Sequence, residues 1–199
     1  MGEKLMDTER TCLLIIDIQY DFLDASSPLF VRGGPSIISN IEKILNYFRE
    51  NNQLVIFVKR LHRSDGSDVD KTRIELFQRT GGFLIGGTRG AEIVEAIKPL
   101  PSEAVVIKKR WSAFFHTELD LMLRREKIKD LIICGIQTPN CIRATFTDAI
   151  SLDYDVIVLE DGTASSNLEI QKSNLLDMEN IGAKILRTDE VINLLKYQI

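Results

Sequence analysis

The sequence predicts an α/β fold built around a parallel sheet. Short apolar runs rich in β-branched residues, such as 11–16 and 54–58, are typical of strands buried on both faces. Segments whose apolar residues recur with helical spacing lie between these runs. Because strands that alternate with helices pair in parallel through crossovers, the helices are expected to cover both faces of the sheet.

The elements are expected in a regular order along the chain. Strands are predicted over residues 11–16, 54–58, 104–107, 131–134, 154–159 and 183–186. Helices are predicted over residues 36–51, 91–97, 117–125, 141–150, 168–180 and 189–196. No linker or internal repeat divides the chain, so residues 1–199 are interpreted as one domain. The whole is a three-layer α/β/α Rossmann-like sandwich with a six-stranded, mainly parallel sheet.

Local signals support the helix boundaries. The helix over 36–51 follows a stretch, 32–35, that is interpreted as loop. Its apolar residues fall on one face, which is expected to pack on the sheet. Gly182 is suited to end the helix over 168–180, because glycine readily adopts the left-handed conformation common at helix ends.

Residues 62–90 form a long polar segment with two glycine pairs, Gly81-Gly82 and Gly86-Gly87. The glycines do not follow the strand–loop–helix pattern of a phosphate-binding loop. Long loops in compact domains are often functional. We therefore interpret this segment as a lid over the site.

Charge and composition restrict the class of partner. A net charge of −4 and an isoelectric point near 5.3 argue against a nucleic-acid-binding surface. No apolar run reaches the ~20 residues that a membrane-spanning helix needs. Residues 1–10 are charged and contain no apolar core of a signal peptide. We expect no nucleic-acid or membrane partner and a cytoplasmic location.

The cysteines point to chemistry at one position. Three cysteines without a C-x-x-C pair favour neither a disulfide framework nor a zinc site. Cys12 and Cys134 lie in apolar runs and are expected in the core. Cys141 instead follows a strand, Gly135 and Pro139, and stands near the start of a helix.

A helix start stabilises a thiolate, because unpaired backbone N–H groups and the positive end of the dipole favour an anion. The pKa of Cys141 is therefore expected below the usual value of ~8.5, which would make it a nucleophile. The same N–H groups could receive an oxyanion. The alternative interpretation is that Cys141 is a small buried hydrophobic residue.

Asp17, Lys108 and Cys141 each lie at or just beyond the end of a different predicted strand. In a parallel sheet these ends meet at one edge, where ligands bind. A carboxylate can take the proton of a thiol, and an ammonium holds the charged pair together. Attack of the sulfur on an amide or ureide carbonyl would give a thioester, which water then cleaves. No histidine is needed for any of these steps.

Three ordered blocks of the sequence resemble those of the isochorismatase-like cysteine hydrolases. They are LLIIDIQYDF (13–22), IKKRWSAF (107–114) and GIQTPNC (135–141). The likeness continues through Thr145, Asp148, Ala149, Tyr154 and Asp161, so it covers nearly the whole chain.

This resemblance implies a role for each residue of the constellation. Asp17 would be the base, Lys108 the positioning cation and Cys141 the nucleophile. Lys109 competes with Lys108, but the spacing to Ser112 selects Lys108, and Lys109 should point to the opposite face. The family also carries a cis non-proline peptide bond before the nucleophile, here 136–137. This bond would aim the N–H groups of Gln137 and Cys141 at the oxyanion.

Further residues are candidates with weaker support. Gln19, Phe22, Trp111 and Phe115 are interpreted as possible lining of the substrate pocket, and ordinary packing is an equal alternative for each. Surface or structural roles are favoured for the two histidines, His62 and His116.

The branches of the family differ in chemistry. Nicotinamidases hold a metal through an Asp-x-His pair, but Arg60 stands two residues before His62, so no metal and no cofactor are expected. The isochorismate-cleaving members lack the cysteine, so Cys141 argues against that reaction. The resemblance therefore implies a hydrolase that cleaves a C–N bond of a small amide, carbamoyl or ureide substrate.

The members that the chain is expected to resemble are nicotinamidases, N-carbamoylsarcosine amidohydrolases and ureidoacrylate amidohydrolases. One alternative is a nicotinamidase-like deamidase with an atypical or absent metal site. Another is a non-catalytic binding or redox-responsive protein on the same fold. A homo-oligomer, dimer or tetramer, is a further implication of the resemblance.

Overall fold

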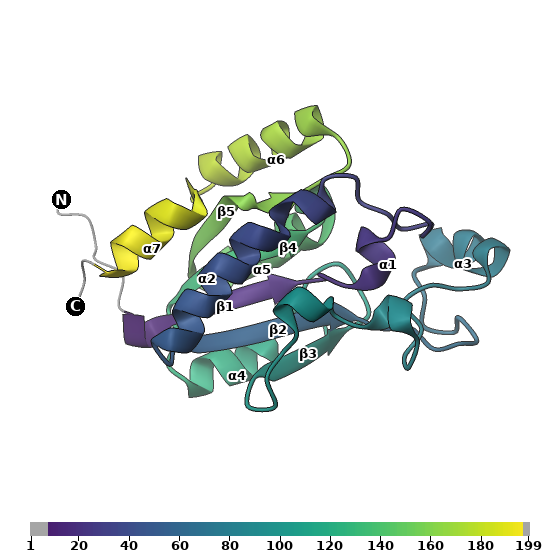
Figure 1. Cartoon of the computed structure of the whole chain (residues 1–199), viewed down its shortest axis with the longest axis horizontal. Helices are drawn as coiled ribbons and strands as arrows, with labels where there is room; N and C mark the ends of the chain where they lie inside the picture. The colour runs from purple at the N-terminus through teal and green to yellow at the C-terminus, as the bar shows by residue number, and fades with distance from the viewer. Residues whose placement is uncertain (1–7, 197–199) are drawn as a thin grey trace.

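A single six-stranded sheet forms the centre of the molecule in the computed structural model, which describes residues 8–196 (Figure 1). Its strand order is β3-β2-β1-β4-β5-β6, and every neighbouring pair is parallel. The strands are β1 (Thr11–Ile16), β2 (Leu54–Arg60), β3 (Ala104–Lys108), β4 (Asp130–Ile136), β5 (Asp155–Ala164) and β6 (Lys184–Leu186). The predicted α/β class and six-stranded sheet are confirmed.

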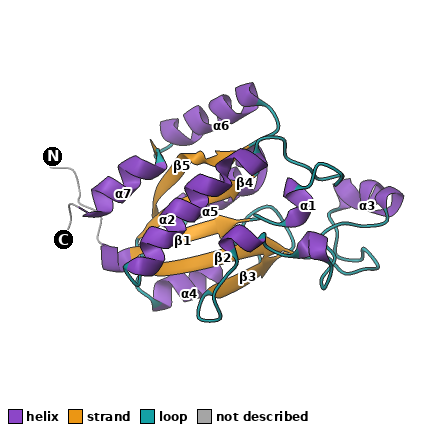
Figure 2. Cartoon of the chain, viewed as in Figure 1, coloured by secondary structure: helices purple, strands orange, loops and turns teal. Residues whose placement is uncertain are grey.

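Helices cover both faces of this sheet (Figure 2). Leu13 and Ile15 of β1 point to the face covered by α2 (Ile38–Glu50) and α7 (Thr188–Lys196). Leu14 and Ile16 belong to the cluster on the other face. That face is covered by α4 (Leu119–Arg125), α5 (Arg143–Ser151) and α6 (Leu168–Asn180). The alternation along β1 explains why the sequence of this strand is apolar throughout.

Two predictions about local structure are wrong. The helix expected over 91–97 is replaced by two 3₁₀ turns, Arg89–Ala91 and Glu95–Ile97. The backbone of Ile93, between them, is extended and pairs with Gln19, which interrupts the helical pattern. The long segment 62–90 is not all loop, since it contains a 3₁₀ turn over Lys71–Arg73 and the helix α3 (Ile74–Thr80).

Other boundaries shift by a turn or a few residues. The helix expected over 36–51 begins as a 3₁₀ turn, Gly34–Ile37, before α2. Strand β5 continues beyond residue 159, because its register against β4 shifts at a bulge and pairing then resumes between Gly135 and Thr163. A short helix, α1 (Tyr20–Leu23), follows β1.

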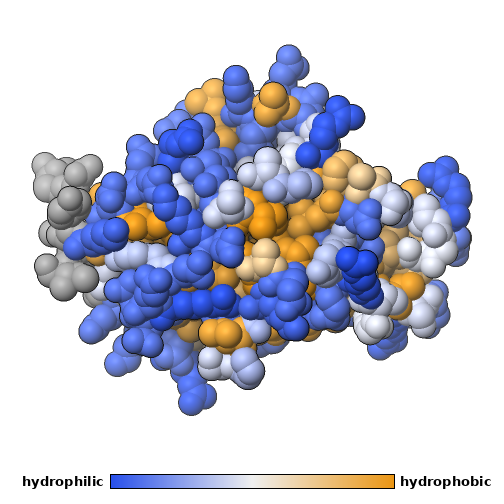
Figure 3. All heavy atoms as spheres, in the orientation of Figure 1, coloured by the Kyte–Doolittle hydropathy of each residue, from blue (hydrophilic) through white to orange (hydrophobic). Residues whose placement is uncertain are grey.

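Hydrophilic side chains cover most of the face shown in Figure 3, and apolar side chains gather towards its middle. No helix within residues 8–196 is both long enough and apolar enough to cross a bilayer.

The order of the strands creates the place where a site can form. From β1 the chain moves towards one side of the sheet through β2 and β3, and then returns to the centre and moves towards the other side through β4, β5 and β6. The strand order therefore reverses between β1 and β4. Ligands of such sheets bind beyond the carboxyl ends of the strands at this reversal. Asp17 follows β1 directly, and the turn that carries Cys141 follows β4.

Candidate active site

Three buried side chains from different segments meet beyond the carboxyl ends of the strands. Lys108 is the last residue of β3, and Cys141 lies in the π-helical turn Thr138–Ile142 after β4. The Lys108 Nζ is 2.7 Å from Oδ2 of Asp17 and 3.3 Å from Sγ of Cys141. It also donates to the carbonyl oxygen of Arg110 at 3.1 Å. The Asp17 carboxylate lies close enough to the Cys141 sulfur to raise the pKa of the thiol.

The backbone around these residues has unusual conformations. Asp17 has a φ of 57°, in the left-handed region that non-glycine residues rarely adopt, and its N–H donates to the carbonyl of Val58. Such conformations concentrate at functional sites. The peptide bond between Ile136 and Gln137 is cis, as the resemblance implied.

Gly135 allows β4 to approach β1 closely. Its φ is 119°, and a Cβ built on it would lie 2.0 Å from the carbonyl oxygen of Ile16. A side chain is therefore excluded by both conformation and space. The close approach of Gly135 to Ile16 places the turn that carries Cys141 beside the end of β1, which Asp17 follows directly.

The resting state of Cys141 differs from the one predicted. Burial and the neighbouring Asp17 carboxylate raise the pKa of the Cys141 thiol to about 11, although Lys108 and Arg60 act in the opposite direction. The predicted thiolate of low pKa, inferred from the helix start alone, is thus wrong. The sulfur of Cys141 is therefore a thiol beside a carboxylate, and Cys12 and Cys134 are free thiols in the core.

Lys109 lies away from this centre, as predicted. Its Nζ donates to the carbonyl oxygen of Leu61 at 2.7 Å and pairs with Asp68 at 2.9 Å. The two adjacent lysines therefore have different partners, and only Lys108 contacts Asp17 and Cys141.

The candidate pocket residues divide into two groups. The Gln19 amide is buried and fully used, because its nitrogen donates to the carbonyls of Arg60 and Ala91 and its oxygen accepts from the Arg60 N–H. Phe22 packs within the hydrophobic core. These contacts leave neither side chain free for a ligand.

Trp111 is half-buried and lies next to the turn that carries Cys141. It lines a hollow of about 530 Å³ with Pro139, Asn140 and Arg143. Phe115 is 51% exposed, and its ring packs edge-on against His116 at 4.5 Å between centroids. Phe115 lines a separate, neighbouring hollow.

Sequence reasoning missed an arginine at this edge. Arg60 is the last residue of β2 and pairs with Lys108 across the strands. Its Nε donates to Nε2 of His62 at 3.1 Å, and its Nη2 forms an ion pair with Asp70. The guanidinium also lies over the Trp111 ring, 4.9 Å from the centroid. In the sequence, Arg60 attracted attention only because it stands where a metal-binding aspartate would be expected.

His62 does not fit a metal site. Its Nε2 accepts from Arg60, and its Nδ1 lies 3.3 Å from Asp68. Burial and the Arg60 charge lower the pKa of His62 to about 4, so the ring is neutral. Within residues 8–196 no group of three His, Cys, Asp or Glu side chains could hold a metal ion. A guanidinium in place of a carboxylate repels the cation such a site would bind.

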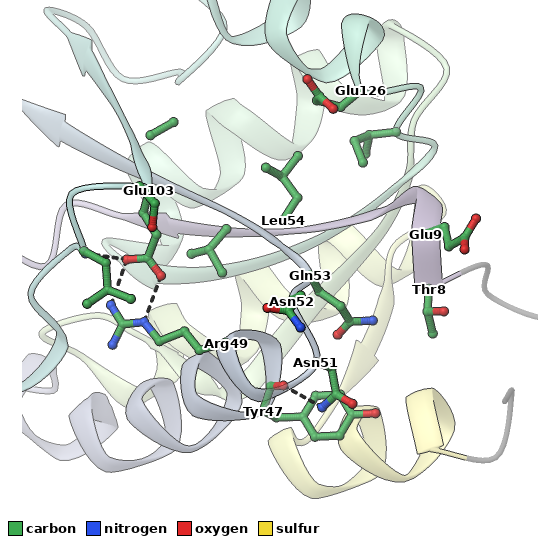
Figure 4. A pocket seen from close by; sticks show the side chains of 15 residues that line it. Thr8, Glu9, Tyr47, Arg49, Asn51, Asn52, Gln53, Leu54, Glu103 and Glu126 are labelled. Carbon is green, nitrogen blue, oxygen red and sulfur yellow. Dashed lines mark hydrogen bonds and ion pairs between the residues drawn. The ribbon is translucent and has the colours of Figure 1, made fainter.

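A larger hollow, of about 800 Å³, lies at the amino ends of the strands, away from the candidate site (Figure 4). It is lined by the end of α2 and the first residues of β2 and β3. Arg49, its main cation, donates two hydrogen bonds of 2.8 Å to Glu103. Asn51 donates to the carbonyl oxygen of Tyr47. These polar groups hold the chain together and form no catalytic set.

Comparison with known proteins shows the family to which the chain belongs. The chain is 42% identical to an Arabidopsis thaliana protein named "Probable inactive nicotinamidase", over 88% of this chain and 91% of that protein. It is 28% identical to the ureidoacrylate amidohydrolase RutB of Variovorax paradoxus, over 92% of this chain and 80% of that protein.

A solved structure of an isochorismatase family protein from Desulfovibrio vulgaris has a TM-score of 0.90 and 39% identity. The match covers 94% of this chain and 98% of that chain. The sequence profile of the isochorismatase domain matches residues 11–190, a range that includes Asp17, Lys108 and Cys141. The chain therefore belongs to the isochorismatase family.

Proposed function

We propose that this protein hydrolyses a C–N bond of a small amide, carbamoyl or ureide compound, with Cys141 as nucleophile, Asp17 as base and Lys108 as positioning cation. The observation that carries the proposal is the meeting of the three side chains, with Lys108 Nζ 2.7 Å from a carboxylate oxygen and 3.3 Å from the sulfur. A buried nucleophile, its base and an orienting group within such distances form the pattern of covalent catalysis.

The first half-reaction makes a thioester. The sulfur attacks the carbonyl carbon while the thiol proton moves to the Asp17 carboxylate. Because the pKa of the thiol is raised to about 11, we infer that proton transfer accompanies the attack rather than preceding it. The oxyanion is received by the N–H groups of Gln137 and Cys141. Asp17, now a carboxylic acid, protonates the leaving nitrogen as the C–N bond breaks.

The second half-reaction restores the enzyme. Asp17, again a carboxylate, takes a proton from water, whose oxygen attacks the thioester carbon. The C–S bond breaks, the sulfur regains its proton, and the acid product leaves. Throughout, the Lys108 ammonium stays beside both partners, so the negative charge that moves between carboxylate and sulfur remains compensated.

The relatives support an amide or ureide substrate. The RutB relative is named as an amidohydrolase, and the Arabidopsis relative as a nicotinamidase described as inactive. Here the carboxylate, ammonium and thiol are present and in contact, which supports turnover. A non-catalytic binding protein is the alternative that the inactive relative raises.

The test is release of ammonia from a panel of small amides, carbamoyl amino acids and ureides. We expect turnover by the wild type, none by Cys141→Ala, and a thioester on Cys141 when the reaction is acid-quenched and analysed by mass spectrometry. Cys134→Ala is the matched control, because Cys134 is equally buried but lies in β4 within the core. Turnover that survives in Cys141→Ala would refute the proposal.

A further inference from the structure

A buried arginine beside the triad has an unused donor. The Arg60 side chain is only 1% exposed, and its Nη1 has no hydrogen-bond partner among the described residues. A buried donor that binds nothing is costly, particularly when it carries charge. Such a group is explained when a ligand supplies the missing acceptor.

The rest of the guanidinium is held firmly in place. Nε is fixed on His62 at 3.1 Å, and Nη2 is paired with Asp70. Asp70 lies at the start of the 3₁₀ turn Lys71–Arg73, so the segment after β2 folds back over the end of its own strand. Two of the three guanidinium nitrogens are therefore committed, and only Nη1 is left to bind a ligand.

Positive charge exceeds negative charge around this donor. Arg73 lies over the Trp111 ring, 4.4 Å from the centroid, and no carboxylate of the described residues is within ion-pair distance of it. Arg110 shares Asp70 with Arg60, at 3.6 Å. With Lys108 paired to Asp17, the cations outnumber the carboxylates. An anionic ligand would correct the imbalance.

This charge lies close to the reacting groups. Arg60 pairs with Lys108 across the strands, and Lys108 contacts both Asp17 and Cys141. The charge of Asp17 also opposes the lowering of the pKa of Arg60 and Arg73 by burial. Trp111, the residue that both guanidinium groups contact, also lines the hollow beside the nucleophile turn. A small molecule whose carbonyl is at Cys141 would therefore have its other end near these arginines.

We propose that Arg60, through its free Nη1, and Arg73 bind a carboxylate of the substrate, so that this protein acts on a small carbamoyl or ureido acid rather than on a neutral amide. The inference rests on the proposed function and names the substrate class for that site. A planar guanidinium matches the geometry of a carboxylate, and a buried pair of this kind is strongly selective. Arg60, which does not fit a metal site, would thus serve to bind the carboxylate of the substrate.

The test compares two ureas of similar length that differ in charge. N-carbamoylglycine carries a carboxylate, and n-propylurea carries an ethyl group in its place. Binding of each to the Cys141→Ala variant, which cannot turn over, is measured by isothermal titration calorimetry. We expect N-carbamoylglycine to bind at least about 10-fold more tightly, since a site built for an anion rejects the analogue that lacks it.

The arginine variants connect the preference to the proposed residues. In the Cys141→Ala background, Arg73→Gln should reduce the preference about 10-fold, and Arg60→Lys should reduce it while keeping the charge, because lysine lacks the fork. Arg73→Gln leaves no carboxylate unpaired, so the fold is expected to survive. Arg89→Gln is the control, because Arg89 is exposed in the same segment but lies over Tyr20.

The outcomes separate this inference from the proposed function. Equal affinity for the two ureas, no measurable affinity for either, or an unchanged preference in Arg73→Gln would overturn the anion site. If the preference is present but the wild type releases no ammonia from any compound of the panel, the anion site stands and the hydrolase proposal fails.

Discussion

The adjacent lysines Lys108 and Lys109 offer the sharpest test of the site. Replacing each by methionine removes an ammonium and keeps most of the length of the side chain. Lys108 and its partner Asp17 are both fully buried, whereas the Lys109 side chain is 43% exposed. The same chemical change at neighbouring positions should therefore have very different consequences.

For Lys108→Met the loss of stability follows from burial. Breaking a buried ion pair by removing one partner leaves an uncompensated charge and costs about 3–5 kcal/mol. An exposed pair such as Lys109 with Asp68 contributes about 0–1 kcal/mol. The variant at Lys108 should thus unfold at clearly lower urea concentration, and kcat/KM for ammonia release should fall by at least about 100-fold.

The measurements are urea denaturation followed by far-UV circular dichroism and steady-state kinetics on folded protein. Lys109→Met is expected to keep both the stability and the activity of the wild type within a factor of a few. Similar losses in the two variants would refute the reasoning, because they would mean that contact with Asp17 and Cys141 has no special importance.

The remaining predictions concern pH and backbone geometry. Since the pKa of Cys141 is raised to about 11, its alkylation by iodoacetamide should accelerate as pH rises from 8 to 11. Asp17→Asn removes the neighbouring carboxylate and should therefore be alkylated faster than the wild type at pH 8. An alkylation rate that is already maximal at pH 6 would contradict this prediction. Because the pKa of His62 is lowered from 6.5 to about 4, the unfolded chain binds a proton first as pH falls, so about 3 kcal/mol of stability, present above pH 6.5, should be lost between pH 6.5 and 4. Urea titrations across this range should show a shallower loss in His62→Gln, and an equal slope would exclude His62 as the cause. Gly135→Ala should abolish folding or lower the free energy of unfolding by more than about 4 kcal/mol, as measured by thermal denaturation. Gly86→Ala is the control, because a Cβ there would meet nothing within 4 Å, and it should melt like the wild type. Equal melting temperatures of the two variants would contradict the close approach of β4 to β1 at Gly135.

The sheet could be predicted from the sequence because each strand is a short apolar run bounded by polar residues. The helix expected over 91–97 could not, since apolar residues at helical spacing also fit an extended stretch, and Ile93 pairs with Gln19 from a distant part of the chain. Pairing with a distant segment thus decided the structure around Ile93. The helix α3 was not predicted because its seven residues are too few to show a helical repeat clearly.

The sequence predicted that three candidate residues would lie together, but it did not predict their electrostatics. Asp17, Lys108 and Cys141 could be found because strand ends in a parallel sheet share one edge. The pKa of Cys141 was predicted in the wrong direction, because the helix start was considered without the buried carboxylate beside the sulfur. Arg60 escaped notice because one arginine at a strand end carries no local pattern, and only its buried, unpaired Nη1 reveals it.

The position of β3 has a consequence for how this protein loses activity. This strand is at the border of the sheet and pairs only with β2, yet it supplies the ammonium that Asp17 and Cys141 share. Border strands separate from a sheet more readily than central ones, through partial opening that leaves the rest folded. Separation of β3 from β2 would therefore abolish turnover in a molecule whose remaining structure is folded. The rate of turnover would then depend on whether β3 is paired rather than on global folding.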